Sequence, residues 1–82
     1  MEATLETIVR YVRQQSPRGR EGAIVIEELP VHKLLDSIAM MDFLVFLERT
    51  FQISISDSDV LPENFASLRA VAQLVESKRK DT

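Results

Sequence analysis

Ser37, directly preceded by Asp36, is the position of this sequence best suited to chemistry. The pair stands before a long apolar stretch, at the expected start of a helix, and by residue type alone either one would serve as its N-cap. A serine triad needs a histidine as its base, and the chain has a single one, His32, with no third residue marked out to orient it. We therefore expect His32 to be an ordinary loop histidine and the chain to have no catalytic residues.

Residue types that bind metals or phosphates are few. The chain has no cysteine, which excludes disulfides and thiolate metal sites, and its lone histidine argues against a zinc site made by protein ligands alone. Asp57 and Asp59 lack the glycine and the distal glutamate of a calcium loop, so capping of a short turn is the better interpretation. Gly19 and Gly22 form no phosphate-binding motif. The sequence thus predicts no metal site.

Acidic residues are concentrated in the middle of the chain. The net charge is −3, and residues 36–75 contain six acidic and two basic side chains. Such a surface repels nucleic acid. Because no apolar run could cross a bilayer and the start lacks the basic residues of a signal peptide, we expect a soluble cytoplasmic protein without membrane insertion.

Hydrophobic periodicity predicts three main helices, at about residues 3–15, 37–51 and 67–78. A short helix is expected at about 58–65, and the breaker-rich stretch that follows the first helix predicts a loop over 16–36. Ser67 is the expected N-cap of the last helix. The predicted core residues are Leu5, Ile8, Val9, Val12, Met40, Phe43, Leu44, Leu47, Phe51, Leu68, Val71, Ala72 and Val75.

Two segments have strand-like patterns, namely residues 23–29, which precede Pro30, and residues 51–56. An isolated pair of strands is marginally stable, so we expect both segments to lie in loops, the second as an extended, half-buried connector. The predicted fold is all-α, one domain over residues 1–82 with three main helices and a short one. An α+β regulatory domain that pairs residues 23–29 with 51–55 is an alternative.

The helix predicted over 37–51 has a second apolar stripe. Ile38, Met41 and Val45 project away from the core face, beside Asp42 and Arg49. Such a stripe is either enclosed by neighbouring helices or exposed as a binding surface. The residues alone leave both interpretations open.

The order of motifs in the second half of the chain resembles that of acyl carrier proteins. Asp36-Ser37-Ile38 is similar to their Asp-Ser-Leu attachment motif. The similarity continues through Phe-Leu-Val-Phe-Leu-Glu-Arg-Thr-Phe (43–51), Ile53-x-Ile55 and Pro-Glu-Asn-Phe-x-Ser-Leu (62–68). The tripeptide is weak evidence by itself, but the ordered set is fairly specific.

The resemblance implies an acyl-carrier-like bundle with a prosthetic group. A phosphopantetheinyl transferase would move 4′-phosphopantetheine from coenzyme A to Ser37, and the terminal thiol of this arm would hold an acyl or aminoacyl group as a thioester. A phosphodiester there would lie at a helix N-terminus, where the dipole favours an anion. Asp36 matches the aspartate that helps to bind the transferase's magnesium.

The resemblance also implies a docking surface. Ile38, Met41 and Val45 match positions that contact partner enzymes in the family, and Asp42 matches an acidic docking position. The implied partners are the transferase, a ligase that loads the acyl or aminoacyl group, and downstream synthase enzymes. We expect the carrier itself to be a monomer and not an enzyme.

Two departures from the family pattern point to a specialised discrete carrier. Lys33, Leu34 and Leu35 occupy positions where many members have a glycine, and Ala39 and Arg49 stand where acids are common. The Leu-Leu-Asp-Ser form is closer to D-alanyl carrier proteins and similar dedicated members, which implies a pathway with its own ligase or synthase. Fatty acyl, polyketide, hydroxyacyl and amino acid cargoes all remain open. The alternative is a small helical interaction module without a prosthetic group, in which Ser37 is only a cap.

Overall fold

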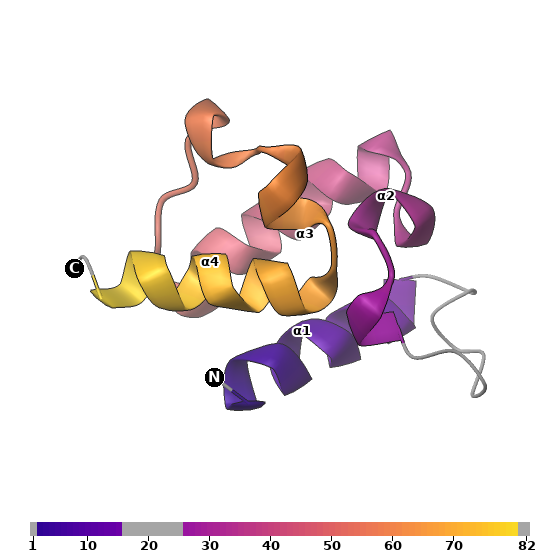
Figure 1. The fold of residues 1–82 in the computed structure, drawn as a ribbon, viewed down its shortest axis with the longest axis horizontal. Helices are drawn as coiled ribbons and strands as arrows, with labels where there is room; N and C mark the ends of the chain where they lie inside the picture. The colour runs from indigo at the N-terminus through magenta and orange to yellow at the C-terminus, as the bar shows by residue number, and fades with distance from the viewer. Residues whose placement is uncertain (1, 16–25, 81–82) are drawn as a thin grey trace.

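A computed structural model describes residues 2–15 and 26–80 as a helical bundle (Figure 1). No strand occurs within these two ranges, and the all-α fold expected from the sequence is confirmed. The elements in chain order are α1 (Glu2–Gln15), the 3-10 turn η2 (Ile26–Glu28), α2 (Val31–Leu34), α3 (Ser37–Phe51), the 3-10 turns η3 (Asp57–Asp59) and η4 (Pro62–Phe65), and α4 (Leu68–Lys80).

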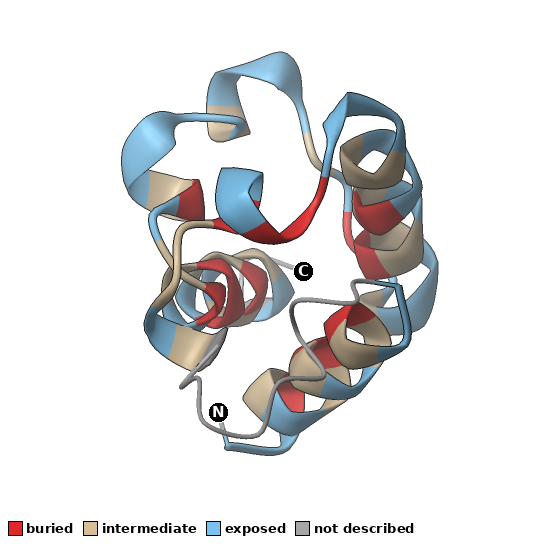
Figure 2. Cartoon of the chain, turned by 90° about the vertical axis from the view of Figure 1, so that its right-hand side faces the viewer, coloured by how far each residue is buried: buried red, intermediate tan, exposed pale blue. Residues whose placement is uncertain are grey.

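The core lies where the apolar faces of the helices meet (Figure 2). Helix α4 packs against α1, α3, η2 and η4, and the hydroxyl of Thr4 on α1 donates a hydrogen bond to the carboxylate of Glu76 on α4. The predicted core is confirmed, with Leu5, Val9, Met40, Leu44 and Phe51 half-buried at its edge. The fully enclosed side chains are Ile8, Val12, Val31, Phe43, Leu47, Leu68, Val71, Ala72 and Val75.

An aromatic cluster joins α1 to α3. Tyr11 stacks on Phe46 with ring centroids 4.0 Å apart, and the Phe43 and Phe51 rings lie 6.4 Å from that of Phe46. Offset and edge-on arrangements of this kind add to the free energy gained from burial. Burial, and then the nearby charge of Asp42, raise the pKa of Tyr11 above its ordinary value. No pattern in the sequence predicts that Tyr11 pairs with α3.

The prediction of a single loop over residues 16–36 is wrong for the part that the structure describes. Residues 26–28 form η2 and residues 31–34 form α2. The breaker-rich stretch 16–22 and the strand-like residues 23–25 lie outside the described residues. Of the described part of that strand-like pattern, residues 26–28 form a 3-10 turn and Leu29 a bend, so none of it is a strand.

Helix α2 forms because Pro30 precedes it as the N-cap residue and its apolar side chains are buried in the core. Pro30, with φ −60° and ψ 140°, accepts the N–H of Lys33 at 3.0 Å. Val31, Leu34 and Leu35 follow at i, i+3 and i+4 and are almost fully buried. That spacing after a proline was the available signal. It was missed because four residues are too few for a periodicity to stand out from a loop.

Residues 53–56 lie outside the helices as predicted, whereas Phe51, the first residue of the expected connector, is the last residue of α3. Gln52 adopts the left-handed conformation (φ 55°, ψ 53°) and ends the helix, with its N–H directed to the carbonyl of Glu48. The Glu48 carboxylate then accepts the N–H of Ile55 at 2.8 Å, while Ile53 is buried. These contacts fix the connector against the bundle, so it needs no neighbouring strand to hydrogen-bond with.

The short helix predicted at about 58–65 is instead two 3-10 turns, η3 and η4. Pro62 begins the second turn, because its missing N–H and fixed φ suit a helix start but cannot continue η3. The hydroxyl of Ser67 accepts the N–H of Ala70 at 3.0 Å, so the predicted N-cap of α4 is confirmed.

Candidate functional site

Asp36 and Ser37 have different roles at the start of α3. Asp36 is extended (φ −79°, ψ −176°), and its carboxylate accepts the N–H of Ala39 at 2.8 Å. Its carbonyl accepts the first intrahelical bond, from the N–H of Met40 at 2.8 Å. Asp36 is therefore the N-cap and Ser37 the first helical residue. The alternative in which Ser37 is only a cap is wrong on this point.

The Asp36–Ser37 pair follows a buried segment and lies on the surface itself. Leu34 and Leu35 are each 5% exposed and anchor the chain in the core, whereas Asp36, Ser37 and Ile38 are all exposed. The first turn of a helix has backbone N–H groups without intrahelical partners, and the positive end of the dipole lies there. An anion on Ser37 would be favoured at this position and would be accessible to another protein.

The second apolar stripe of α3 lies on the surface. Ile38 is 76% exposed, Met41 68% and Val45 43%. Helical geometry places these three and exposed Asp42 within an arc of about 100°. We call these four residues the α3 patch. Of the two interpretations that the sequence left open, the structure excludes the buried one.

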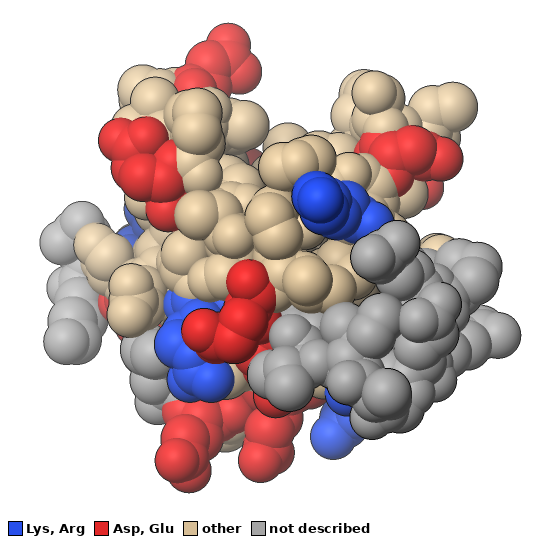
Figure 3. All heavy atoms as spheres, turned by 45° about the vertical axis from the view of Figure 1, so that its right-hand side comes forward, with Lys and Arg blue, Asp and Glu red and all other residues tan. Residues whose placement is uncertain are grey.

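An apolar groove of about 470 Å³ lies between α2, the first turns of α3 and the η3–η4 segment. Met40 lines it from α3, one turn after Ser37, and His32 lines it from α2. The other lining residues are Pro30, Val60, Leu61, Pro62, Phe65 and Ala66. In Figure 3, the upper part of the face in view is mostly uncharged surface between two groups of acidic side chains, with acidic and basic side chains mixed below it.

The groove has no counterpart among the features predicted from the sequence. Val60 and Leu61, at 43% and 42% exposed, fall within the short helix expected at about 58–65. Two adjacent apolar residues between turn-forming residues were the available sequence signal for an apolar surface at this point. Their juxtaposition with Met40 depends on the path of η3 and η4, which no local pattern specifies.

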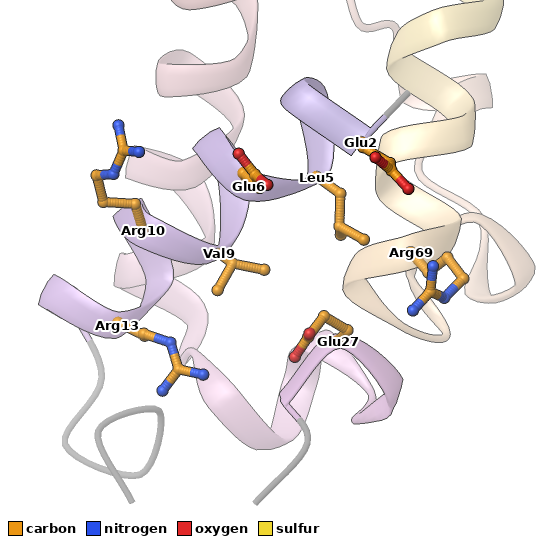
Figure 4. A pocket seen from close by; sticks show the side chains of 8 residues that line it. All are labelled: Glu2, Leu5, Glu6, Val9, Arg10, Arg13, Glu27 and Arg69. Carbon is orange, nitrogen blue, oxygen red and sulfur yellow. The ribbon is translucent and has the colours of Figure 1, made fainter. Parts of the chain in front are cut away.

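A larger cavity, of about 620 Å³, lies elsewhere, between α1, η2 and the start of α4. In Figure 4, Leu5 and Val9 point toward its middle, and Glu27 lies between Arg13 and Arg69. Glu2, Glu6 and Arg10 complete the lining. Ser37 and the α3 patch do not contribute to it, so its mixed charges belong to a different part of the surface.

Other kinds of site find no support in the described ranges. Across residues 2–15 and 26–80, no cluster of three or more His, Cys, Asp or Glu side chains is arranged to hold a metal ion. Within the same ranges, no helix has the length and apolar character needed to span a bilayer. Asp57 and Asp59, considered above for calcium, lie in η3, where Asp59 pairs with Lys78.

The comparison that decides the family covers α3, η3, η4 and the first half of α4. A family model described as a phosphopantetheine attachment site matches residues 35–75, which is half of the chain. The chain belongs to the phosphopantetheine attachment-site family. Members of this family have a covalently attached 4′-phosphopantetheine and act as its carriers. Neither the curated proteins nor the solved structures yielded a match.

Membership in the phosphopantetheine attachment-site family sets the chemistry that the site has to support. The prosthetic group supplies a thiol at the end of a long tether, so the carrier's own residues need only hold the phosphate end and present the arm. The family also implies contact with a transferase and with synthase enzymes.

Proposed function

We propose that this protein is a carrier that holds acyl or aminoacyl intermediates as thioesters on a 4′-phosphopantetheine arm attached to Ser37. The observation that supports it best is that Asp36 caps α3, which leaves exposed Ser37 without a structural task at a helix N-terminus. The whole chain, residues 1–82, then acts as one carrier domain and catalyses no reaction itself.

Electrostatics support the choice of Ser37 over other serines. A phosphodiester on Ser37 would be close to the unpaired N–H groups and the positive end of the α3 dipole. Ser67, at the start of α4, is half-buried and already bonded to Ala70. Asp36 remains exposed beside Ser37, in a position to help bind the magnesium ion of a visiting transferase.

The α3 patch is the proposed docking surface for partner enzymes. Its apolar members, Ile38, Met41 and Val45, would supply contact area, while Asp42 would steer basic partners. We propose as partners a phosphopantetheinyl transferase, a loading ligase and the downstream synthase of a dedicated pathway. The free thiol of the arm requires a reducing compartment, which supports a cytoplasmic location. The carrier is proposed to be a monomer.

The deciding experiment is loading of the native protein. It is incubated with coenzyme A, magnesium and a broad-specificity phosphopantetheinyl transferase, and its intact mass is recorded. We expect a gain of a single phosphopantetheine. A protein that several transferases leave unmodified would contradict the proposal and favour a helical interaction module without a prosthetic group.

Asp36 is expected to have two separable roles. Asp36→Ala should lower the free energy of unfolding by about 1 kcal/mol, because the bond to the Ala39 N–H is lost. Asp36→Asn should retain the cap, since asparagine caps as well as aspartate, but it should slow arm transfer because the charge is gone. Urea unfolding and initial loading rates measure the two effects. Equal loading rates for native protein and Asp36→Asn would rule out the role in transfer.

Met41→Glu tests the α3 patch. Met41 is 68% exposed, so the fold should tolerate the charge, whereas docking should weaken and raise the KM of the transferase and loading ligase for the carrier about tenfold. Gln73→Glu, which places the same charge at an exposed position of α4, is the control and should leave KM unchanged. A large fall in the melting temperature of Met41→Glu, or no change in KM, would contradict the docking role.

A further inference from the structure

Three hydrogen-bonding groups converge on one carboxylate oxygen of Asp59, at the end of η3. Its Oδ2 accepts the backbone N–H of Ser56 and the hydroxyl of the same residue, each at 3.0 Å. The ammonium of Lys78, from α4, lies 2.6 Å from the same oxygen. The hydrogen bond from Lys78, and then that from the Ser56 backbone, lower the pKa of Asp59, so the carboxylate is charged at neutral pH.

Residues 57–61 have little apolar burial to hold them, whereas Phe65 anchors η4 in the core. No residue of η3 is buried, and Val60 and Leu61, which follow it, are both exposed by more than 40%. The carbonyl of Asp59 also accepts the side-chain amide of Asn64 at 2.8 Å, which extends the same network into η4. Polar contacts centred on Asp59 therefore fix the course of the chain between η3 and η4.

The Asp59–Lys78 pair differs from a usual surface ion pair in its shielding. Its side chains are 17% and 28% exposed, against 59% and 48% for Glu28 and Arg69, which pair at 2.8 Å between η2 and α4. Solvent screens exposed pairs strongly and shielded pairs less. Of the two, the Asp59–Lys78 pair is the one suited to determine a conformation.

We propose that the Asp59–Lys78 ion pair is a clamp that holds η3 on α4 and thereby positions the Val60–Leu61 wall of the apolar groove. Asp59 is then a positioning residue for the groove. Release of the clamp frees this wall from α4 while the core of α1, α3 and α4 stays folded. The inference concerns the unmodified chain and does not depend on attachment of an arm to Ser37.

Hydrogen exchange of backbone amides, followed by NMR on the full-length unmodified protein, tests the clamp. The reporters are the N–H groups of Val60, Leu61 and Asn64, which bond to the carbonyls of Asp57, Asp59 and Leu61 respectively. In Lys78→Met their exchange should speed up about threefold to tenfold, whereas exchange in the middle of α1 and α3 should stay as in the native protein. Lys78→Arg, which keeps the charge, should restore native rates.

Two further measurements separate the clamp from a general loss of stability. Glu28→Gln, which breaks the exposed pair with Arg69, should leave the reporter amides unchanged. High salt should speed their exchange in the native protein but not in Lys78→Met, because only the native protein has the pair to screen. Asp59→Asn provides a second variant with the same expected pattern. Unchanged reporters in Lys78→Met, an equal rise throughout the bundle, or no rescue by arginine would each overturn the inference.

Discussion

Ser37→Ala is expected to abolish loading, so that the variant keeps its unmodified mass under conditions in which the native protein gains one phosphopantetheine. The arm is joined through a serine hydroxyl, and alanine offers no oxygen for the phosphodiester. The fold should be unaffected, within about 0.5 kcal/mol of unfolding free energy, because Ser37 is exposed and Asp36 provides the cap of α3. Intact-mass spectrometry and urea unfolding measure the two quantities on the same samples.

Ser67→Ala is the matched control, since it also removes a hydroxyl at the start of a helix. Its effects should be the reverse, with normal loading and a loss of about 1 kcal/mol in stability, because the Ser67 hydroxyl caps α4 through the Ala70 N–H. A modified Ser37→Ala protein would mean that the arm is attached to another residue. Loading that fails in both variants but succeeds in the native protein would implicate folding rather than the attachment site.

Phe43→Ala should have the largest effect on stability, with a loss of about 3–5 kcal/mol in the free energy of unfolding. Phe43 is 0% exposed, and its ring lies 5.8 Å from that of Tyr11 and 6.4 Å from that of Phe46, so truncation leaves a cavity and breaks up the cluster that joins α1 to α3. A domain of this size is stabilised by only about 5–15 kcal/mol. Urea unfolding followed by circular dichroism provides the measurement.

Met41→Ala, two residues earlier on the same helix, is the control for Phe43→Ala. Because Met41 is 68% exposed, its truncation should change stability by less than about 0.5 kcal/mol. If Phe43→Ala does not fold, Phe43→Leu should still show a measurable loss, of about 1 kcal/mol. Similar losses for positions 41 and 43 would show that the core face of α3 has been assigned wrongly.

The long helices could be predicted from the sequence because each buries one stripe of apolar residues, and burial repeats with the helical period. Helix α3 covers the predicted residues 37–51, while α1 and α4 differ from prediction by one or two residues at their ends. Short elements could not be predicted in this way. Helix α2 and the turns η2, η3 and η4 have four residues or fewer, so tertiary contacts rather than periodicity determine them.

The residue types of the site could be predicted from the sequence, but not which residue is the N-cap and which is the first helical residue. Aspartate and serine are almost equally good N-caps, so sequence alone could not tell which of Asp36 and Ser37 accepts the Ala39 N–H. Burial of Leu35 makes Asp36 the N-cap, because the chain leaves the core in an extended conformation before the helix can begin. Whether the α3 patch is buried or exposed likewise depends on the packing of neighbouring elements, which the sequence does not show.

Contacts between distant parts of the chain had no local signal at all. Tyr11 stacks on Phe46 and Asp59 pairs with Lys78, yet nothing near either residue in the sequence indicates its partner. The sequence predicts Asp59 as a cap of the short turn, but Ser56 is the N-cap of η3, and Asp59 is its last residue, which accepts hydrogen bonds from Ser56. Its tie to α4 appears only once the helices are assembled.

The stacking of Tyr11 on Phe46 provides an intrinsic optical reporter. Tyr11 is the only tyrosine and the chain has no tryptophan, so the tyrosine fluorescence of the intact protein comes from the junction of α1 with α3. Its raised pKa keeps the phenol protonated, and therefore emissive, beyond the ordinary value of 10.0. Separation of the two helices can thus be followed without an attached dye.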